Sequence, residues 1–600
     1  MAENRFKYFV LMQIFAVFLF GSVFVSSAQQ DDSIEVALDV NSSPVTSLPK
    51  IFKPGIDISG RGFHREPTWP QGLAAKEVLD KWQKEIGFEG VYRLPYSLWE
   101  ISQLSKNAEL QNKLIATYDE VIKRISDSGG TVIVNVFGMP AGLGKILDRR
   151  SPPQDFREFK KFVKKTISEL SCNKKYNVWY EVWNAPDLDD FFLGRKQDYL
   201  YLYRSIAEAV KELERQNKIH IPVGGPSISG WFQNINGNNV LTPEKSLVYE
   251  LIKYCYRYHL PLDFISWHVY STATSPEKDE TIYKKTIISL TRDWLSYFKF
   301  KKETPLIIDE WNYDKSINVL PERKEKSFVA ASYIPSRIKG MYESGIDYQA
   351  YYCLEDFQHN KEGITRNVGV FSFDPEYVEY KGTPKATYNV FRMLSKLGKE
   401  MFLLKTQDDF AGVIVTKSPE EIAILAYNYS DQDLVTNYLS KNIAYLAGSE
   451  RRFLLDIIKT GDVDKIMSGD IEISKLRMTK RVKNFLRKAQ ELNSREKKFE
   501  TTPRNIKLQI KGLKGNYLYE KYVVDSSCAQ NCKFAPQEDK ELPMLQSFQE
   551  TLVLKPYSVQ LILLKNKPPD PEPEVKEAVK EPVKESIPEA KEVSAVKQKQ

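Results

Sequence analysis

The sequence has few of the residues that build metal sites and disulfide frameworks. Among its 600 residues there are only 5 cysteines and 5 histidines. The odd cysteine count excludes a fully paired framework, and the histidines do not fall at the spacings of a zinc site. We therefore expect no metal ion and no cofactor. Cys528 and Cys532, four residues apart in loop-like sequence, are candidates for one small disulfide ring, whereas Cys172, Cys255 and Cys353 are expected to be packed thiols.

The chain also lacks a dominant charge. Its 86 Lys and Arg nearly balance 79 Asp and Glu, and the net charge of +7 is too small for a dedicated nucleic-acid-binding protein. The excess is local, because ten basic residues and only two acidic ones lie between Lys475 and Lys498. That window is either a solvated helical face or a surface for an acidic polymer or anionic envelope, with binding that weakens as salt rises.

Only one long apolar run is present. Arg5 and Lys7 precede the apolar segment Phe9–Val25, and Ser26-Ser27-Ala28 supplies the small residues of a cleavage site. Residues 1–28 are thus predicted to be a signal peptide, and the protein to be exported to the periplasm, envelope or medium. An uncleaved membrane anchor is the alternative, since the run is close to the minimum length of a span.

Between residues 51 and 400 the sequence repeats an apolar strand, a polar loop and an amphipathic helix. This alternation predicts an α/β fold, a (β/α)8 TIM barrel, with helices such as Ala75–Ile86, Phe159–Leu170 and Leu247–Tyr258. An open doubly wound sheet is the alternative fold, but such a sheet rarely contains eight strand–helix units. The expected strands are Gly55–Ser59, Gly90–Arg93, Thr131–Phe137, Val178–Trp183, Ile221–Gly225, Asp263–Trp267, Pro305–Glu310 and Tyr348–Tyr352.

After residue 400 the pattern changes to short strands interrupted by helical sequence. Residues 401–439 and 501–564 are predicted to form an accessory β-sandwich, and residues 440–500 a basic helical insertion. Ser33–Val40, within the N-terminal segment 29–50, alternates apolar and polar residues and could add a strand to the sandwich. The Pro/Glu/Lys-rich tail, residues 565–600, contains no aromatic residue and is expected to be disordered.

The candidate catalytic residues lie where the barrel strands end, which is where barrel enzymes place their chemistry. Glu310 follows an apolar strand and suits a nucleophile that forms a covalent intermediate, although a structural ion-paired glutamate is the alternative. Arg93 could hold Glu310 ionised, Tyr270 could donate a hydrogen bond to it, and His268 could position a substrate hydroxyl.

Tryptophans are also frequent near these strand ends. Trp99, Trp183, Trp231, Trp267 and Trp311 could offer flat faces to sugar rings, or could be core residues. Alternation along a strand points Trp267 and His268 in opposite directions. Two or three of them, Trp231 and Trp311 in particular, are expected to contact a carbohydrate.

Two motifs resemble the catalytic signatures of retaining glycosidases of the large (β/α)8 clan: Trp183-Asn184-x-Pro186 and Ile308-Asp309-Glu310-Trp311-Asn312. The nearest resemblance is to glycoside hydrolase family 39. It implies cleavage of β-linked or uronic-type O-glycosidic bonds in a polysaccharide or oligosaccharide. It also implies that Glu310 is the nucleophile and that Asn184 binds the sugar 2-hydroxyl.

One position departs from that family. The general acid/base glutamate is expected between Asn184 and Pro186, where this chain has Ala185. A retaining mechanism uses that group twice, and its loss typically costs about 10²–10⁴-fold in rate. Three explanations stay open: a nearby carboxylate such as Asp187 substitutes, the cleft of an envelope pseudoenzyme only binds carbohydrate, or the alanine was introduced to trap a complex.

Overall fold

The computed structural model describes residues 33–567, with gaps at 61–68, 239–241, 281–283, 314–326, 359–364, 367, 373–381, 405–407, 409, 432–433, 444–445 and 530. The predicted signal peptide, residues 1–28, lies outside the described residues. So does most of the predicted tail, although the last strand of the sandwich extends into it as far as Lys567. Within these described ranges, no helix combines the length and the apolar character that crossing a bilayer requires.

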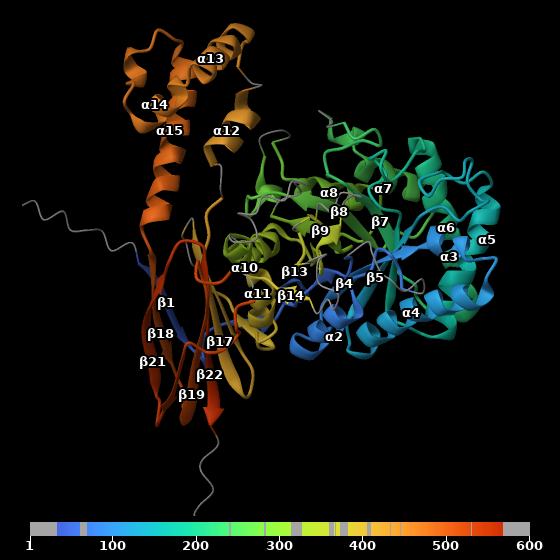
Figure 1. Cartoon of the computed structure of the whole chain (residues 1–600), viewed down its shortest axis with the longest axis horizontal. Helices are drawn as coiled ribbons and strands as arrows, with labels where there is room; N and C mark the ends of the chain where they lie inside the picture. The colour runs from blue at the N-terminus through green and yellow to red at the C-terminus, as the bar shows by residue number, and fades with distance from the viewer. Residues whose placement is uncertain are drawn as a thin grey trace, which may run out of the picture.

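The first domain is a closed barrel of parallel strands, as predicted (Figure 1). Neighbouring strands follow chain order, and the last pairs with the first through Tyr351 and Tyr352, opposite Ile56 and Asp57. The eight barrel strands are β3 (Ile56–Asp57), β4 (Val91–Ser97), β5 (Thr131–Phe137), β6 (Val178–Val182), β7 (Val223–Ile228), β8 (Phe264–Tyr270), β9 (Leu306–Asn312) and β10 (Tyr348–Tyr352).

Amphipathic helices cover the outside of the barrel. In α5 the residues Phe159, Val163 and Ile167, spaced at helical intervals, are buried against the sheet. The Asp155 side chain caps the first turn of α5 by accepting from the Arg157 N–H. The helices along this part of the chain are α2 (Lys76–Glu85), α3 (Leu98–Gln103), α4 (Ala108–Asp127), α5 (Phe156–Ile167), α6 (Lys196–Asn217), α7 (Leu247–Tyr258), α8 (Ile287–Tyr297), α10 (Ser327–Ser344) and α11 (Ala386–Leu394).

The second domain is a β-sandwich of two sheets that enclose their own apolar core. The alternating segment near the N-terminus does join it, because β1 pairs with β18 from Ile34–Ile506 to Asp39–Lys511. One sheet contains β1 (Ile34–Asp39), β18 (Arg504–Lys511) and β21 (Ser547–Leu554). The other contains β2 (Val45–Ser47), β15 (Glu400–Phe402), β16 (Ala411–Lys417), β17 (Glu421–Asn428), β22 (Ser558–Lys567), β19 (Asn516–Val524) and β20 (Glu538–Leu542).

A helical insertion interrupts the sandwich between β17 and β18. It has a core of its own, built from residues such as Leu454, Ile466 and Phe485. Figure 1 shows its helices standing out beyond one end of the sandwich, away from most of the barrel. The helices are α12 (Leu434–Asn442), α13 (Gly448–Thr460), α14 (Asp462–Ser468) and α15 (Lys480–Thr501).

The predicted disulfide ring is present, in a loop of the sandwich that is hydrogen-bonded to the barrel domain. Cys528 is bonded to Cys532 in the loop after β19. Within this loop the Ala529 carbonyl accepts hydrogen bonds from the Ala386 N–H and the Ser327 hydroxyl, at the starts of α11 and α10. Cys255 and Cys353 are buried thiols, as expected, and Cys172 is half-buried.

A buried ion pair fixes the loop that follows β8. Both oxygens of Glu277 bind Arg337 of α10, and the two side chains are 1% and 0% exposed. The guanidinium also donates to the Thr274 carbonyl, 3.0 Å away. Breaking a buried pair is costly because the remaining charge has no counter-ion.

We therefore expect Glu277→Gln to lower the free energy of unfolding by about 3–5 kcal/mol. Glu343→Gln is the matched control, because Glu343 pairs with Lys278 at the surface, where both side chains are 46% exposed. The control should lose less than about 1 kcal/mol. Denaturant unfolding of both variants measures the difference, and equal losses would show that the buried pair contributes no more than a surface pair.

Candidate active site

A single arginine organises the carboxyl-terminal end of the barrel. Arg93 on β4 is 3% exposed, and all five of its N–H groups donate hydrogen bonds. Its acceptors come from five other parts of the barrel: Asp57 at 2.9 Å, Glu181 at 2.7 Å, Asn184 at 2.6 Å, Ser227 at 3.0 Å and Glu310 at 3.3 Å.

Glu310 is the one acid of this cluster that reaches the surface. Its side chain is 12% exposed, whereas Asp57, Glu181 and Asp309 are completely buried. One oxygen of Glu310 accepts from Arg93 and the other accepts from the Tyr270 hydroxyl. The carboxylate is therefore held in one orientation with its charge stabilised, as the sequence predicts for a nucleophile.

His268 forms a second cation beside Glu310. Its Nε2 lies 3.6 Å from a Glu310 oxygen and 3.5 Å from an Asp309 oxygen. The same nitrogen lies 3.1 Å from the Ser227 hydroxyl, and that hydroxyl donates a hydrogen bond to Asp309 at 2.7 Å. Burial alone would lower the pKa of His268, but Glu310 and Asp309 raise it to about 9. The ring is therefore charged at neutral pH and adds to the positive field around Glu310.

The buried acids beneath Glu310 differ in protonation. Burial, together with the adjacent Asp309, raises the pKa of Glu181 above its ordinary range. Burial also disfavours the charged form of Asp309, but His268 and Arg93 hold its pKa well below the usual value. Glu181 thus carries a proton more readily than Asp309, as expected for two carboxyl groups that share one site. Glu181 is a buried structural acid, as its position in the strand predicts.

Position 185 lies beside this network but contributes no side-chain chemistry. Ala185 is 2% exposed, and its N–H donates to the Ser227 carbonyl at 2.9 Å. Its neighbour Asn184 is partly exposed and uses its carbonyl oxygen to accept from Arg93. Within the described residues, the Asn184 amide nitrogen makes no hydrogen bond, so it remains available to a ligand.

Three of the nearby carboxylates have structural partners, whereas Asp189 and Asp190, on the loop after β6, are exposed. Asp187 is 4% exposed, and its two oxygens accept from the N–H and hydroxyl of Ser229, which ties the loop after β6 to the end of β7. Glu355 and Asp356, after β10, are fully buried; Glu355 accepts from the Ala75 N–H and Asp356 binds Lys385. None of the three reaches the surface as Glu310 does.

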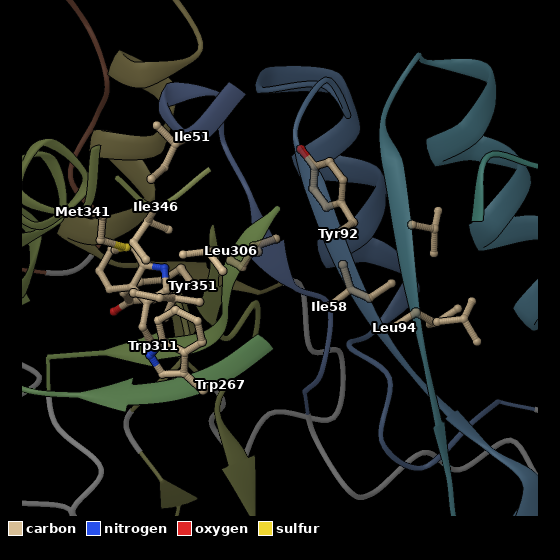
Figure 2. Packing of buried hydrophobic residues seen from close by; sticks show 14 of the residues in the cluster. Ile51, Ile58, Tyr92, Leu94, Trp267, Leu306, Trp311, Met341, Ile346 and Tyr351 are labelled. Carbon is tan, nitrogen blue, oxygen red and sulfur yellow. The ribbon is translucent and has the colours of Figure 1, made fainter. Parts of the chain in front are cut away.

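The expectation for the tryptophans is wrong for Trp311. Figure 2 shows Trp267 and Trp311 among apolar side chains, and both are 0% exposed. The indole N–H of Trp311 donates to Gln349, and the ring packs edge-on against Tyr333 and Tyr351. Since strand residues alternate, an inward-facing Glu310 directs the next residue outward to the helices.

Trp231 is also unavailable as an open sugar platform. It is 2% exposed and stacks on Trp294, while its N–H donates to Thr291. It lines a cavity of about 170 Å³ together with His268 and Tyr270. Trp183 is fully buried as well, which leaves Trp99, half-buried after β4, as the remaining candidate near the strand ends.

Several site residues were missed from the sequence. Asp57, Asn135, Ser227 and Asp309 all belong to the network, and Asn135 donates to Glu181 at 3.0 Å. The sequence feature that could have identified them is a polar residue inside an otherwise apolar barrel strand. Such a side chain needs a hydrogen-bonding partner in the barrel interior. Among the described residues, no group of His, Cys, Asp and Glu has the arrangement of a metal site.

Comparison with known proteins places this geometry in a family. The model of glycosyl hydrolases family 39 matches residues 148–447, half of the chain. The chain belongs to glycosyl hydrolase family 39. The match begins after β5, so the Arg93 part of the site is supported by the geometry rather than by the family model.

Two relatives of this family 39 protein are β-xylosidases. One, from Caldicellulosiruptor saccharolyticus, is 23% identical over 59% of this chain and 72% of the relative. The other, from Geobacillus stearothermophilus, is 27% identical over 42% of this chain but only 48% of the relative. The crystal structure of the family 39 enzyme from Xanthomonas axonopodis pv. citri has the same fold, with a TM-score of 0.58 and 14% sequence identity. The superposition covers 91% of this chain and the whole of the Xanthomonas chain. Family membership supports a glycosidase.

The position of His268 predicts a pH-dependent stability. Its folded pKa of about 9 lies above the unfolded value, so its stabilising contribution is complete below about pH 6.5 and is lost as the pH rises through 9. The loss should be about 3 kcal/mol. Unfolding at several pH values should show a flatter profile for His268→Gln than for the wild type.

His220→Gln is the control, since the His220 side chain is 66% exposed. It should keep the wild-type fall in stability between pH 6.5 and 9. Identical profiles for His268→Gln and the wild type would contradict the charged state assigned to His268.

Proposed function

We propose that this protein acts on O-glycosidic bonds through a glycosyl ester on Glu310, with a step that is slow because position 185 supplies no proton. The observation that carries the proposal is the unique exposure of Glu310 in the Arg93 cluster, with both oxygens oriented by hydrogen bonds. Since the named relatives are β-xylosidases, β-xylosides are the first substrates to test.

In the first step a Glu310 oxygen attacks the anomeric carbon, and the bond to the leaving oxygen breaks with its electron pair. Arg93, Tyr270 and His268 hold the carboxylate in position until the ester forms. The Asn184 amide is placed to donate to a sugar hydroxyl. The leaving oxygen takes its proton from water, because alanine cannot provide one.

In the second step water must attack the anomeric carbon and displace the Glu310 carboxylate, and it must pass its proton to solvent because position 185 offers no general base. Retaining glycosidases use one carboxyl group for both proton transfers, so its absence slows both steps. Asp187 is a weak substitute, because Ser229 engages both of its oxygens. A binding protein that no longer turns over carbohydrate is the second candidate, and Ala185 is the observation that favours it.

We also propose that the protein is exported, on the basis of the signal-like residues 1–28. This proposal is independent of the chemistry at Glu310.

If the nucleophile is active without an acid partner, aryl β-xylosides with good leaving groups should react, and alkyl β-xylosides should barely react. Azide needs no base, so it should raise the steady-state rate and yield a β-xylosyl azide. Rates are followed by release of the phenol, and the azide product by mass spectrometry and NMR. Equal rates for good and poor leaving groups, with bond cleavage rate-limiting, would contradict the missing-acid mechanism.

Restoring the carboxyl group separates the two candidate functions. Ala185→Glu should raise turnover of unactivated β-xylosides by about 10²–10⁴-fold. Ala185→Gln is the matched control, since it has the same size but cannot transfer the proton. If Ala185→Glu folds and binds saccharide but gains no more activity than Ala185→Gln, the protein is a carbohydrate-binding protein.

A further inference from the structure

Helix α13 of the insertion exposes aliphatic side chains. Leu454 and Ile457 point into the insertion core, being 3% and 8% exposed. Leu455 and Ile458, on the adjoining side of the helix, are each 48% exposed. At about 100° per residue, these two side chains form one stripe along α13. An exposed aliphatic stripe on a solvated helix indicates contact with an apolar environment.

Basic residues line the same stripe. Arg451 precedes Leu455 by one helical turn, Lys459 follows it by one turn, and Arg452 lies beside them. All three are exposed. Helix α13 contains two acids: Asp456 lies at the far edge of the stripe by the same helical geometry, and Glu450 lies in the first turn. This pattern of aliphatic and basic residues is typical of helices that lie in a membrane interface.

The neighbouring helix adds positive charge at the same end. The Thr479 hydroxyl, which caps α15, donates to Glu450 in the first turn of α13 at 2.6 Å, so the two helices begin side by side. Lys480 and Arg481 then open α15, whose first turn contains no acid. Cations at a helix start oppose the helix dipole, and Glu450, which interacts with Arg481, offsets part of that cost.

The shape of the molecule leaves this end accessible. Figure 1 shows α13 at the tip of the insertion, beyond the end of the sandwich. Leucine and isoleucine give no flat aromatic face for stacking on a sugar ring, whereas they can enter the interfacial region of a bilayer. Phe453, which is 38% exposed, lies about 160° around α13 from Leu455 and is not part of the stripe. The apolar part of the surface therefore favours lipid over an acidic polysaccharide.

We propose that α13 docks the protein on an anionic phospholipid membrane. Leu455 and Ile458 enter the headgroup region, and Arg451, Arg452 and Lys459 bind lipid phosphates. The partner and the surface are separate from the glycosidic chemistry at Glu310, so either proposal can fail without the other.

Co-sedimentation of the full chain with vesicles tests the proposal. The protein should bind phosphatidylcholine vesicles that contain phosphatidylglycerol and should not bind pure phosphatidylcholine vesicles. The triple variant Arg451→Gln, Arg452→Gln, Lys459→Gln should lower the partition coefficient about a hundredfold, because each basic residue contributes roughly fivefold near an anionic surface. The double variant Leu455→Ser, Ile458→Ser should lower it about tenfold.

The matched control removes three exposed lysines from the barrel side: Lys106→Gln, Lys113→Gln, Lys123→Gln. It changes the net charge equally and should keep near-normal binding, and circular dichroism verifies the fold of each variant. Failure to bind anionic vesicles, equal binding to neutral ones, or an equal loss in the control would overturn the proposal. So would binding that is restricted to a soluble polyuronate, because the partner would then be an acidic polysaccharide.

Discussion

The candidate site depends on the burial of one guanidinium group among four carboxyl groups. Arg93 uses all of its donors on Asp57, Glu181, Asn184, Ser227 and Glu310, and Asp309 lies 3.7 Å away. Removing an arginine from water is costly unless its hydrogen bonds are complete. The barrel must therefore close in register before the cation is satisfied, and that same closure places Glu310 at the surface of the cluster.

Much of the fold could be predicted because barrel strands are buried on both faces and appear as continuous apolar runs. Thr131–Phe137 and Tyr348–Tyr352 have the predicted bounds in the structure. The charged strand β20, Glu538–Leu542, was missed, because its exposed Glu-Asp-Lys-Glu sequence has no apolar pattern and it pairs only at the sheet edge.

The site was predictable where a chemically informative residue type coincides with a strand end, as for Arg93, Tyr270 and Glu310. The role of a residue was not predictable where it depends only on the direction in which the side chain points. Trp311 is adjacent to Glu310 but points to the helices, whereas Asp57 lies in a short strand and points to Arg93. At position 185 the backbone still bonds to Ser227, so the local structure is kept while the proton donor is absent. Under the proposed mechanism, the site thus has a nucleophile in Glu310 but no proton donor at position 185.

Covalent trapping tests this account most directly. Incubation with a 2-deoxy-2-fluoro-β-xyloside that carries a dinitrophenolate leaving group should add one fluoro-sugar to the intact mass, since the activated leaving group needs no acid. Peptide mapping should place the ester on Glu310, and Glu310→Gln should fold and remain unlabelled. A label on another residue, a labelled Glu310→Gln variant, or no label on a protein that binds the sugar would contradict the assignment of Glu310 as nucleophile.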